Sequence, residues 1–233
     1  MKIIKIFIDP GHGGRDPGAV ANGLREKDLV LIIAKALKKY LEQYENVEVK
    51  LSREDDHFLT LKQRTDMANA WGATIFISIH VNAGGGIGFE SFIWNGSVSA
   101  ATISNQNVIH AEIMKQIGGR DRGKKRANFA VVRESRMPAL LTEAAFIDND
   151  QDAARLKDPG FLDSLALGHA NGIVKVFGLK KKPEPKPAPA TEAPIYRVSI
   201  NGKQIFALRE KGNIIRQLDQ HIGTAKEIKL ERI

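Results

Sequence analysis

The chain has 233 residues, 42% of them hydrophobic, which is enough for one core of ordinary domain size with a small appendage. It contains no cysteine, so disulfides and thiolate metal sites are excluded and any metal must be bound by His, Asp or Glu. The formal charge is +8, and residues 195–233 alone carry 8 Lys and Arg against 4 Asp and Glu. This excess favours a polyanionic partner such as nucleic acid, teichoic acid or an anionic surface, and a solvated surface explains it equally well.

The N-terminus is basic and then apolar, but Lys5 interrupts the apolar run and Asp9-Pro10 ends it. A secretory signal has a longer apolar run and a small-residue cleavage site, so this segment is predicted to be a first core strand. No stretch of the sequence approaches the ~20 apolar residues of a membrane span. We therefore expect synthesis in the cytoplasm without a signal peptide, and no membrane span.

The first 179 residues alternate between strand and helix patterns. In chain order they predict a strand at 3–8, a helix at 29–41, strands at 47–51 and 74–79 around a helix at 61–70, a strand at 89–94, a helix at 108–117, a strand at 139–142 and a helix at 161–177. This alternation predicts an α/β domain with a mostly parallel twisted sheet and helices on both faces. In such sheets, functional sites form at the carboxyl ends of the strands.

The segment 180–194 holds five prolines and no large apolar residue, which predicts an extended, semi-stiff linker. It separates a domain at 1–179 from a small module at 195–233. In that module, strands are predicted at 196–200, 204–208 and 227–230 and a helix at 213–221, with Asn201-Gly202 as a hairpin turn. A ββαβ module of this size has too small a core to be robust alone, so we expect self-association or docking to support it.

Two histidines and two glutamates occupy the predicted active edge of the sheet. His12 and His80 follow predicted strands, Glu143 ends one, and Glu26 opens the first helix. Zinc hydrolases commonly use three nitrogen or oxygen ligands and leave a fourth position for water. His12, Glu26 and His80 form such a set, and Glu143 can serve as the general base of a metal-assisted amide or ester hydrolase.

Each of these four residues also has a purely structural interpretation. His12 can fill a Gly-rich turn, Glu26 can be a first-turn acid favoured by the helix dipole, and His80 can be a hydrogen-bonded strand-end histidine. Glu143 can pair with a neighbouring arginine. The sequence contains no His-Glu-x-x-His helix, no Gly-x-Ser-x-Gly elbow and no phosphate loop after Gly84, so other common hydrolase signatures do not apply.

Ordered blocks of residues running through 3–178 resemble the zinc-dependent N-acetylmuramoyl-L-alanine amidases of the amidase-3 type, which include bacterial autolysins and phage endolysins. The blocks are Ile8-Asp9-Pro10-Gly11-His12-Gly13-Gly14, Glu26, Arg53-Glu54-Asp55-Asp56, Leu61-Lys62-Gln63-Arg64, Ser78-Ile79-His80-Val81-Asn82-Ala83, Arg126-Ala127-Asn128-Phe129-Ala130-Val131-Val132-Arg133 and Glu143-Ala144-Ala145-Phe146-Ile147-Asp148-Asn149.

The resemblance implies that His12, Glu26 and His80 bind Zn²⁺ and that Glu143 is the catalytic carboxylate. The implied reaction is hydrolysis of the amide between the lactyl group of N-acetylmuramic acid and L-alanine, which leads to cell-wall lysis. Asn82, Asn128 and Arg133 are expected to line the substrate groove, although a structural role explains them as well.

The tail resembles half of a SPOR-type peptidoglycan-binding repeat. Such repeats usually come in pairs, so a single copy implies a homodimer formed through residues 195–233. The expected partners are peptidoglycan and anionic wall polymers. The linker and single binding module favour a phage endolysin over a mother-cell lysis enzyme, in either case acting on the bacterial cell wall after release.

Three alternatives remain open on the sequence alone. The domain can be a zinc peptidase that cuts within the stem peptide, or a non-catalytic module that binds the wall. The basic tail also raises nucleic-acid binding, but it has few aromatic residues and no recognised nucleic-acid-binding fingerprint, so we expect no nucleic-acid partner.

Overall fold

The computed structural model describes residues 3–183, 196–208 and 226–232. They fall into two compact units, Met1–Lys182 and Pro183–Ile233. The larger unit extends into the predicted linker, because the amide of Glu45 donates to the carbonyl of Lys180 and the amide of Lys182 donates to the carbonyl of Gln43, at 2.9 and 2.7 Å. The first residues after position 179 are therefore part of the larger unit.

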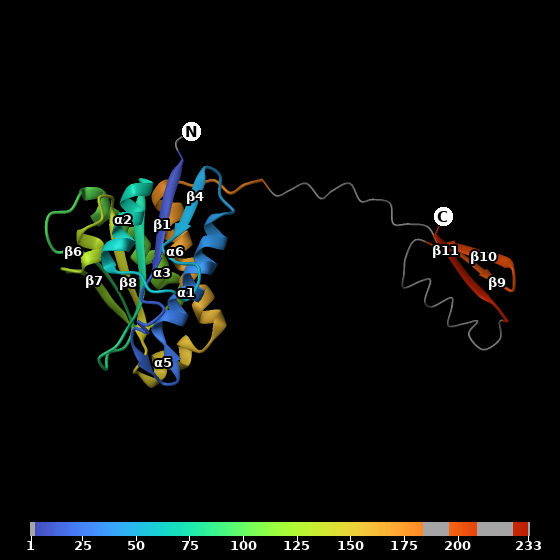
Figure 1. Ribbon diagram of the computed structural model, residues 1–233, viewed down its shortest axis with the longest axis horizontal. Helices are drawn as coiled ribbons and strands as arrows, with labels where there is room; N and C mark the ends of the chain where they lie inside the picture. Colours follow the sequence, from blue (N-terminus) through green and yellow to red (C-terminus); the bar gives the residue numbers. More distant parts are fainter. Residues whose placement is uncertain (1–2, 184–195, 209–225, 233) are drawn as a thin grey trace. The chain divides into compact units, whose positions relative to one another are not determined.

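The larger unit is built on a six-stranded sheet with the order β4-β1-β5-β8-β6-β7 (Figure 1). These strands are β1 (Ile4–Pro10), β4 (Val47–Leu51), β5 (Ile75–Asn82), β6 (Phe89–Trp94), β7 (Asp121–Ala127) and β8 (Ala139–Phe146). Neighbouring strands run parallel except β6 and β8, which are antiparallel. The prediction of an α/β fold with a mostly parallel sheet is confirmed.

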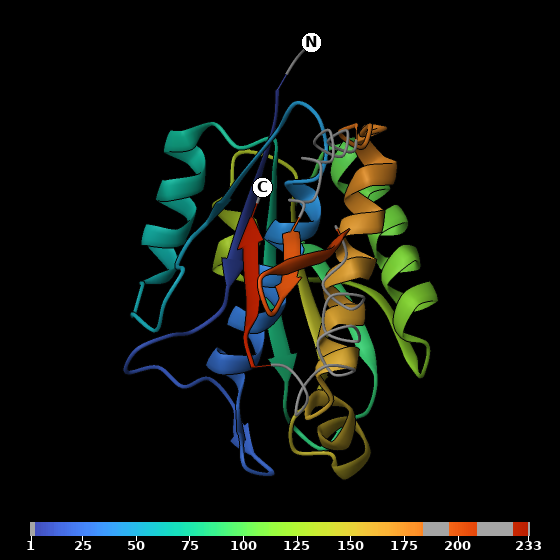
Figure 2. The same cartoon turned by 90° about the vertical axis from the view of Figure 1, so that its right-hand side faces the viewer.

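Helices cover both faces of this sheet (Figure 2). One face packs against α1 (Glu26–Leu41), α3 (Ala100–Ile117) and α6 (Pro159–Phe177), and the other against α2 (Leu61–Trp71) and the short α4 (Ala130–Arg133). Successive side chains of a strand point to opposite faces of the sheet and so belong to two separate hydrophobic cores. Ile6 and Ile8 of β1 pack in the core with α1 and α6, and Phe7 packs in the core with α2. Helix α5 (Asp150–Leu156) connects β8 to α6.

Local signals fix the ends of the helices. Thr60 and Gln63 form a reciprocal capping box at the start of α2, which ends at Gly72 in the left-handed region (φ 68°). Asp158 caps α6 by accepting from the amide of Gly160, and Gly178 (φ 59°) ends it. None of the described helices is both long and apolar enough to cross a membrane.

Several elements differ from the sequence prediction. Strands β5 and β8 continue to Asn82 and Phe146, so His80 and Glu143 lie inside strands and not at their ends. Helix α3 begins at Ala100, well before residue 108, because Ser99 caps it by accepting from the amide of Thr102. The sequence patterns did not predict α4, α5, β7 and the short hairpin of β2 (Val20–Ala21) and β3 (Leu24–Arg25).

The smaller unit contains a three-stranded antiparallel sheet with the order β10-β9-β11. Its strands are β9 (Tyr196–Ile200), β10 (Lys203–Leu208) and β11 (Ile228–Arg232). Asn201 and Gly202 both have positive φ, 50° and 75°, as a two-residue hairpin turn of the predicted kind requires. The helix predicted at 213–221 lies outside the described residues.

Candidate metal centre

Three of the four predicted residues converge at one point of the larger unit. His12 lies in the loop after β1, Glu26 is the first residue of α1, and His80 lies on β5. One ligand atom from each lies within 4.8 Å of the others. Residues separated by up to 68 positions in the chain thus form one cluster, close to the carboxyl ends of the neighbouring parallel strands β1 and β5.

Glu26 is the centre of this cluster and is only 4% exposed. Its Oε1 lies 2.9 Å from Nδ1 of His80 and 3.1 Å from Nε2 of His12, and it accepts from the amide of Val81 at 3.0 Å. Its Oε2 accepts from the amide of Ala19 at 2.9 Å. Both carboxylate oxygens are therefore held in place, and one of them points at the two imidazole rings.

The backbone around His12 is held from outside the loop. His12 has a positive φ of 58°, which is rare for a residue with a Cβ. Arg64 donates to the carbonyl of His12 at 2.7 Å and Arg53 donates to the carbonyl of Gly11 at 2.8 Å. The Nδ1 atom of His12 pairs with Asp16 at 2.9 Å, which orients the ring with Nε2 toward Glu26.

Two glycines allow the cluster to close. A Cβ on Gly11 would lie 2.3 Å from the His80 ring, and a Cβ on Gly18 would lie 2.6 Å from Glu26 Oε2 and 2.7 Å from the His12 ring. Both distances are far inside van der Waals contact. The glycines are therefore required by the close approach of the backbone to the candidate ligands.

The electrostatics of the cluster favour a cation at its centre. Burial opposes the charged forms of both histidines, but the Glu26 carboxylate outweighs this effect and raises the pKa of His12 and of His80. Burial likewise opposes the charge on Glu26, but its hydrogen bonds with the two histidines hold the pKa of that carboxyl well below its usual value. Two nitrogen donors and one ionised carboxylate at this spacing suit a divalent cation that takes the place of the protons.

Glu143 lies beside this cluster on the neighbouring strand. It is the register partner of His80 in the parallel pair β5–β8 and of Glu90 in the antiparallel pair β6–β8. Its Oε2 atom is buried and has no hydrogen-bond partner among the described residues. Burial first, and then the nearby Glu26 and Glu90 carboxylates, raise the pKa of Glu143 to about 7.

The three residues expected in the groove do not form one group. Asn82 lies two residues after His80 on β5 and donates from Nδ2 to Glu90 Oε1 at 2.7 Å. Arg133 donates to the Asn128 side chain at 2.7 Å and to Glu134 at 2.9 Å. Arg133 and Asn128 therefore bind each other, next to α4. Only Asn82 is thus brought next to the residues that surround Glu143.

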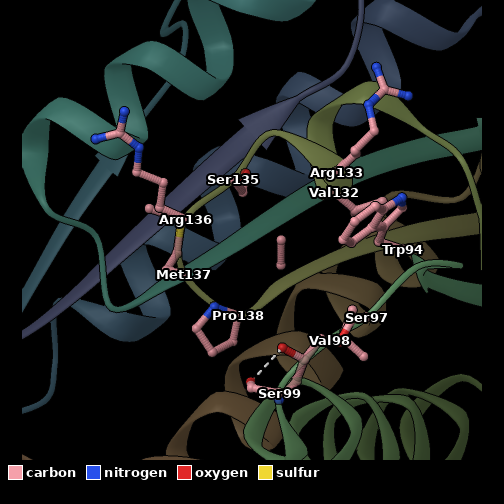
Figure 3. A pocket seen from close by; sticks show the side chains of 12 residues that line it. Trp94, Ser97, Val98, Ser99, Val132, Arg133, Ser135, Arg136, Met137 and Pro138 are labelled. Atoms are coloured by element: carbon pink, nitrogen blue, oxygen red, sulfur yellow. Dashed lines mark hydrogen bonds between the residues drawn. The ribbon is translucent and has the colours of Figure 1, made fainter.

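Arg133 also lines a cavity of about 200 Å³ together with Trp94, Arg136 and Pro138 (Figure 3). The guanidinium groups of Arg133 and Arg136 point away from the centre of this cavity (Figure 3). Pro138 precedes β8, so the cavity lies at the amino end of that strand, whereas the metal cluster lies toward the carboxyl end. This cavity is therefore separate from the candidate metal centre.

A larger cavity of about 330 Å³ adjoins the cluster itself. Its lining includes His12 and His80 together with the apolar side chains of Phe58, Leu59 and Leu61. A mostly apolar cavity with a few convergent polar groups is the usual form of a ligand site.

The residues that support the site were not predicted from the sequence. Asp9 is fully buried and accepts from Ser52, Ser78 and Arg64 at 2.6, 2.9 and 2.8 Å. The spacing of residues along α2 could have indicated the buried position of Arg64. Arg64 precedes the buried Ala68 by four residues and so lies on the same, inward face of the helix.

Comparisons with known proteins identify the family to which the chain belongs. The family model described as N-acetylmuramoyl-L-alanine amidase matches residues 6–175. This chain belongs to that family. The resemblance of residues 3–178 to the amidase-3 type is confirmed, and with it the expectation of a peptidoglycan amidase.

Individual relatives of this amidase match it over different lengths. The chain is 51% identical over 212 residues to N-acetylmuramoyl-L-alanine amidase CwlM of Bacillus licheniformis, covering 91% of this chain and 78% of that protein. It is 47% identical over 182 residues to the endolysin of Bacillus phage SPP1, covering 76% and 67%. The crystal structure of N-acetylmuramoyl-L-alanine amidase from Clostridium difficile 630 superposes with a TM-score of 0.74 at 33% identity, covering 76% and 98%.

Proposed function

We propose that His12, Glu26 and His80 bind one zinc ion and that Glu143 is the general base and acid of the amidase reaction. The single observation that carries this proposal is the convergence of the three donor groups directly beside Glu143, the register partner of His80. The scissile bond is the amide between the lactyl group of N-acetylmuramic acid and the nitrogen of L-alanine.

The donor set fits zinc. Two imidazole nitrogens and one carboxylate oxygen are a common three-ligand set for catalytic zinc and leave a coordination position for a water or substrate oxygen. When bound, zinc supplies Lewis acidity toward the scissile carbonyl and makes a water molecule more acidic. His12 is oriented for this task by Asp16, which pairs with its Nδ1 and leaves Nε2 facing the Glu26 carboxylate.

Glu143 has the properties of a proton carrier in this reaction. Its Oε2 has no hydrogen-bond partner among the described residues, which leaves one oxygen available to accept a proton. As the water oxygen attacks the carbonyl carbon, Glu143 takes the water proton. It then delivers that proton to the alanine nitrogen as the carbon–nitrogen bond breaks, so the peptide leaves as a neutral amine.

Digestion of purified cell wall tests this mechanism. The zinc-loaded protein is expected to release new N-terminal alanine without new reducing sugar ends, and Glu143→Ala is expected to abolish that release while still binding zinc. His80→Ala should lose both zinc and activity. New amino termini other than alanine would show a peptidase that cuts within the stem peptide, and wall binding without new termini would show a non-catalytic module.

We further propose that the smaller unit binds cell wall and joins two chains. The small size of the described sheet supports this proposal. Val198 is fully buried, but the other described side chains of the smaller unit are at least partly exposed. The match to CwlM also extends at least 30 residues beyond Lys182, so this relative shares part of the smaller unit. A monomeric full-length chain in light scattering, beside a truncation at residue 182, would refute the dimer. Binding to anionic wall polymers and release onto the cell wall remain predictions of the same kind.

A further inference from the structure

A buried carboxylate with two cations lies next to Glu143 and is not used by the proposed mechanism. Glu90 is 4% exposed, and its backbone lies directly opposite Glu143 in the antiparallel pair β6–β8. Its Oε1 accepts from Asn82, and its Oε2 accepts from Arg122 Nε at 2.8 Å and from Lys125 Nζ. With one acid and two bases, the cluster has a net charge of +1 beside the catalytic carboxylate.

An irregularity in β7 brings both cations to this face. Asp121 to Lys124 of β7 lie opposite only Phe89 to Ser91 of β6, so β7 has one extra residue at this point. Gly123 within the bulge has a φ of 89°. Arg122 and Lys125 are three residues apart and would face opposite sides of a regular strand, but the extra residue lets both reach Glu90.

A second irregularity places an aromatic platform on the same face. His80 and Asn82 of β5 are two residues apart, whereas their partners Glu143 and Phe146 of β8 are three residues apart. The shift brings Phe146 to the face that carries Glu143. The Arg122 guanidinium carbon lies 4.7 Å from the centre of the Phe146 ring, so the guanidinium is held by a hydrogen bond at Nε and by the ring beneath it.

The outer end of Arg122 remains available. The side chain is 26% exposed, and within the described part of the chain its Nη1 and Nη2 have no hydrogen-bonding protein acceptor. A fixed guanidinium with two free parallel N–H groups matches a planar carboxylate in a two-point hydrogen bond. Lys125 helps to neutralise Glu90, which leaves the charge of Arg122 for a ligand.

The position of Arg122 fits the peptide side of the substrate. Arg122 lies on the ring of Phe146, which follows Glu143 by three residues on β8. Three residues of a strand span roughly 10 Å. An extended peptide advances about 3.5 Å per residue, so the second or third residue after the scissile amide reaches this distance. The carboxyl group of N-acetylmuramic acid is itself the acyl part of that amide and carries no charge, so a carboxylate in this region belongs to the peptide.

We propose that Arg122 is a specificity-determining residue that binds a carboxylate of the peptide following L-alanine. This inference rests on the proposed function, since it takes Glu143 as the point at which the amide is cut. Glu90 and the bulge at Gly123 are positioning features that hold the guanidinium in place.

Two synthetic substrates test the proposal. They are N-acetylmuramoyl-L-alanyl-D-glutamate and the same molecule with both glutamate carboxyls converted to carboxamides. The zinc-loaded full chain is expected to prefer the carboxylate form by about 10- to 100-fold in kcat/KM, mostly through KM, as one charge-assisted pair would give. Arg122→Gln should abolish the preference with little change for the carboxamide, and Arg122→Lys should retain part of it. Lys124→Gln is the control. It removes a charge from the same strand, but the Lys124 side chain binds Asn107, so this variant should keep the preference for the carboxylate form.

Equal rates on both substrates for the wild type, or an unchanged preference in Arg122→Gln, would overturn the proposal. A direct binding measurement makes the test independent of turnover. L-alanyl-D-glutamate is expected to bind the wild type more tightly than its diamide, and Arg122→Gln should bind the two equally. Failure of both substrates to release L-alanyl-D-glutamate or its diamide would refute the proposed function, while the binding comparison would still decide the role of Arg122.

Discussion

Arg64 and Asp9 form an ion pair of 2.8 Å between Nη1 and Oδ1 in which the side chains are 3% and 0% exposed. The same guanidinium donates to the carbonyls of Pro10 and His12 at 2.8 and 2.7 Å. One side chain of α2 therefore fixes both the end of β1 and the loop that presents His12. A cation that binds one side chain and two backbone carbonyls between Asp9 and His12 links the stability of the fold to the geometry of the metal centre.

We expect Arg64→Met to destabilise the metal-free protein by about 3–5 kcal/mol, because it leaves a buried carboxylate without its cation. Zinc affinity should fall about 10- to 100-fold, as is typical when the support of a ligand is removed. Chemical denaturation and a zinc titration measure the two effects. Arg25→Met is the control, because its pair with Asp28 is exposed on both sides and its loss should change stability by less than about 1 kcal/mol.

Glu143→Gln should remove activity and stabilise the metal-free protein at neutral pH. In the folded state the pKa of Glu143 is about 7, against an ordinary value of 4.5, so the folded protein keeps a proton that the unfolded chain loses between these values. Stability therefore falls as pH rises from 4.5 to 7, by roughly 3 kcal/mol in total. Denaturation curves of the wild type and variant at several pH values measure this difference. The prediction fails if the exposed Glu134→Gln gives the same pH profile as Glu143→Gln.

His169 should make the fold sensitive to acid. It is fully buried between Thr142 Oγ1 at 3.0 Å and the carbonyl of Leu165 at 2.7 Å, and burial lowers its pKa to about 4. The unfolded chain takes up a proton at 6.5 and the folded protein does not, so stability should be lost as pH falls from 6.5 to 4, by roughly 3 kcal/mol. His169→Gln should flatten this slope in denaturation experiments, whereas the exposed His57→Gln should not. NMR titration of His169 provides a direct check, and a pKa near 6.5 would contradict the argument.

Zinc binding should release protons and weaken at low pH. The Glu26 carboxylate raises the pKa of both His12 and His80, so these histidines retain protons in the metal-free protein at a pH where free imidazole has lost them. Zinc must displace these protons to bind. Calorimetric titration in buffers of different ionisation enthalpy measures the number released, which should rise as the pH is lowered. An affinity that does not change between pH 6 and 8 would argue against the ligand assignment.

Gly11→Ala should disrupt the metal centre with little effect elsewhere. The added methyl group would lie 2.3 Å from the His80 ring, so the ring must move and zinc affinity should fall by at least 10-fold. Gly72→Ala is the control. Among the described residues its Cβ meets nothing within 4 Å, and its left-handed conformation (φ 68°, ψ 45°) produces backbone strain of about 1 kcal/mol. Metal content after dialysis distinguishes the two variants.

The strands and helices of the core were predictable because their apolar side chains repeat with the expected period. Strand β7 was not, since its sequence from Asp121 to Ala127 is mostly charged and shows no alternation. The three candidate metal ligands were found because His and Glu recur at the edge where parallel strands end. The positions of Glu90, Arg122 and Phe146 could not be found this way, because two register shifts decide which face they occupy.

The charged character of β7 has a consequence for the behaviour of the protein in solution. This strand is the last in the sheet and leaves one row of backbone groups unpaired. Its lysines and arginines, and the local twist that its bulge produces, make that row a poor template for a strand from another molecule. The same feature that orients Arg122 therefore protects this edge from aggregation, and replacing Lys124 and Arg126 with Val and Thr should lower the concentration at which the protein precipitates.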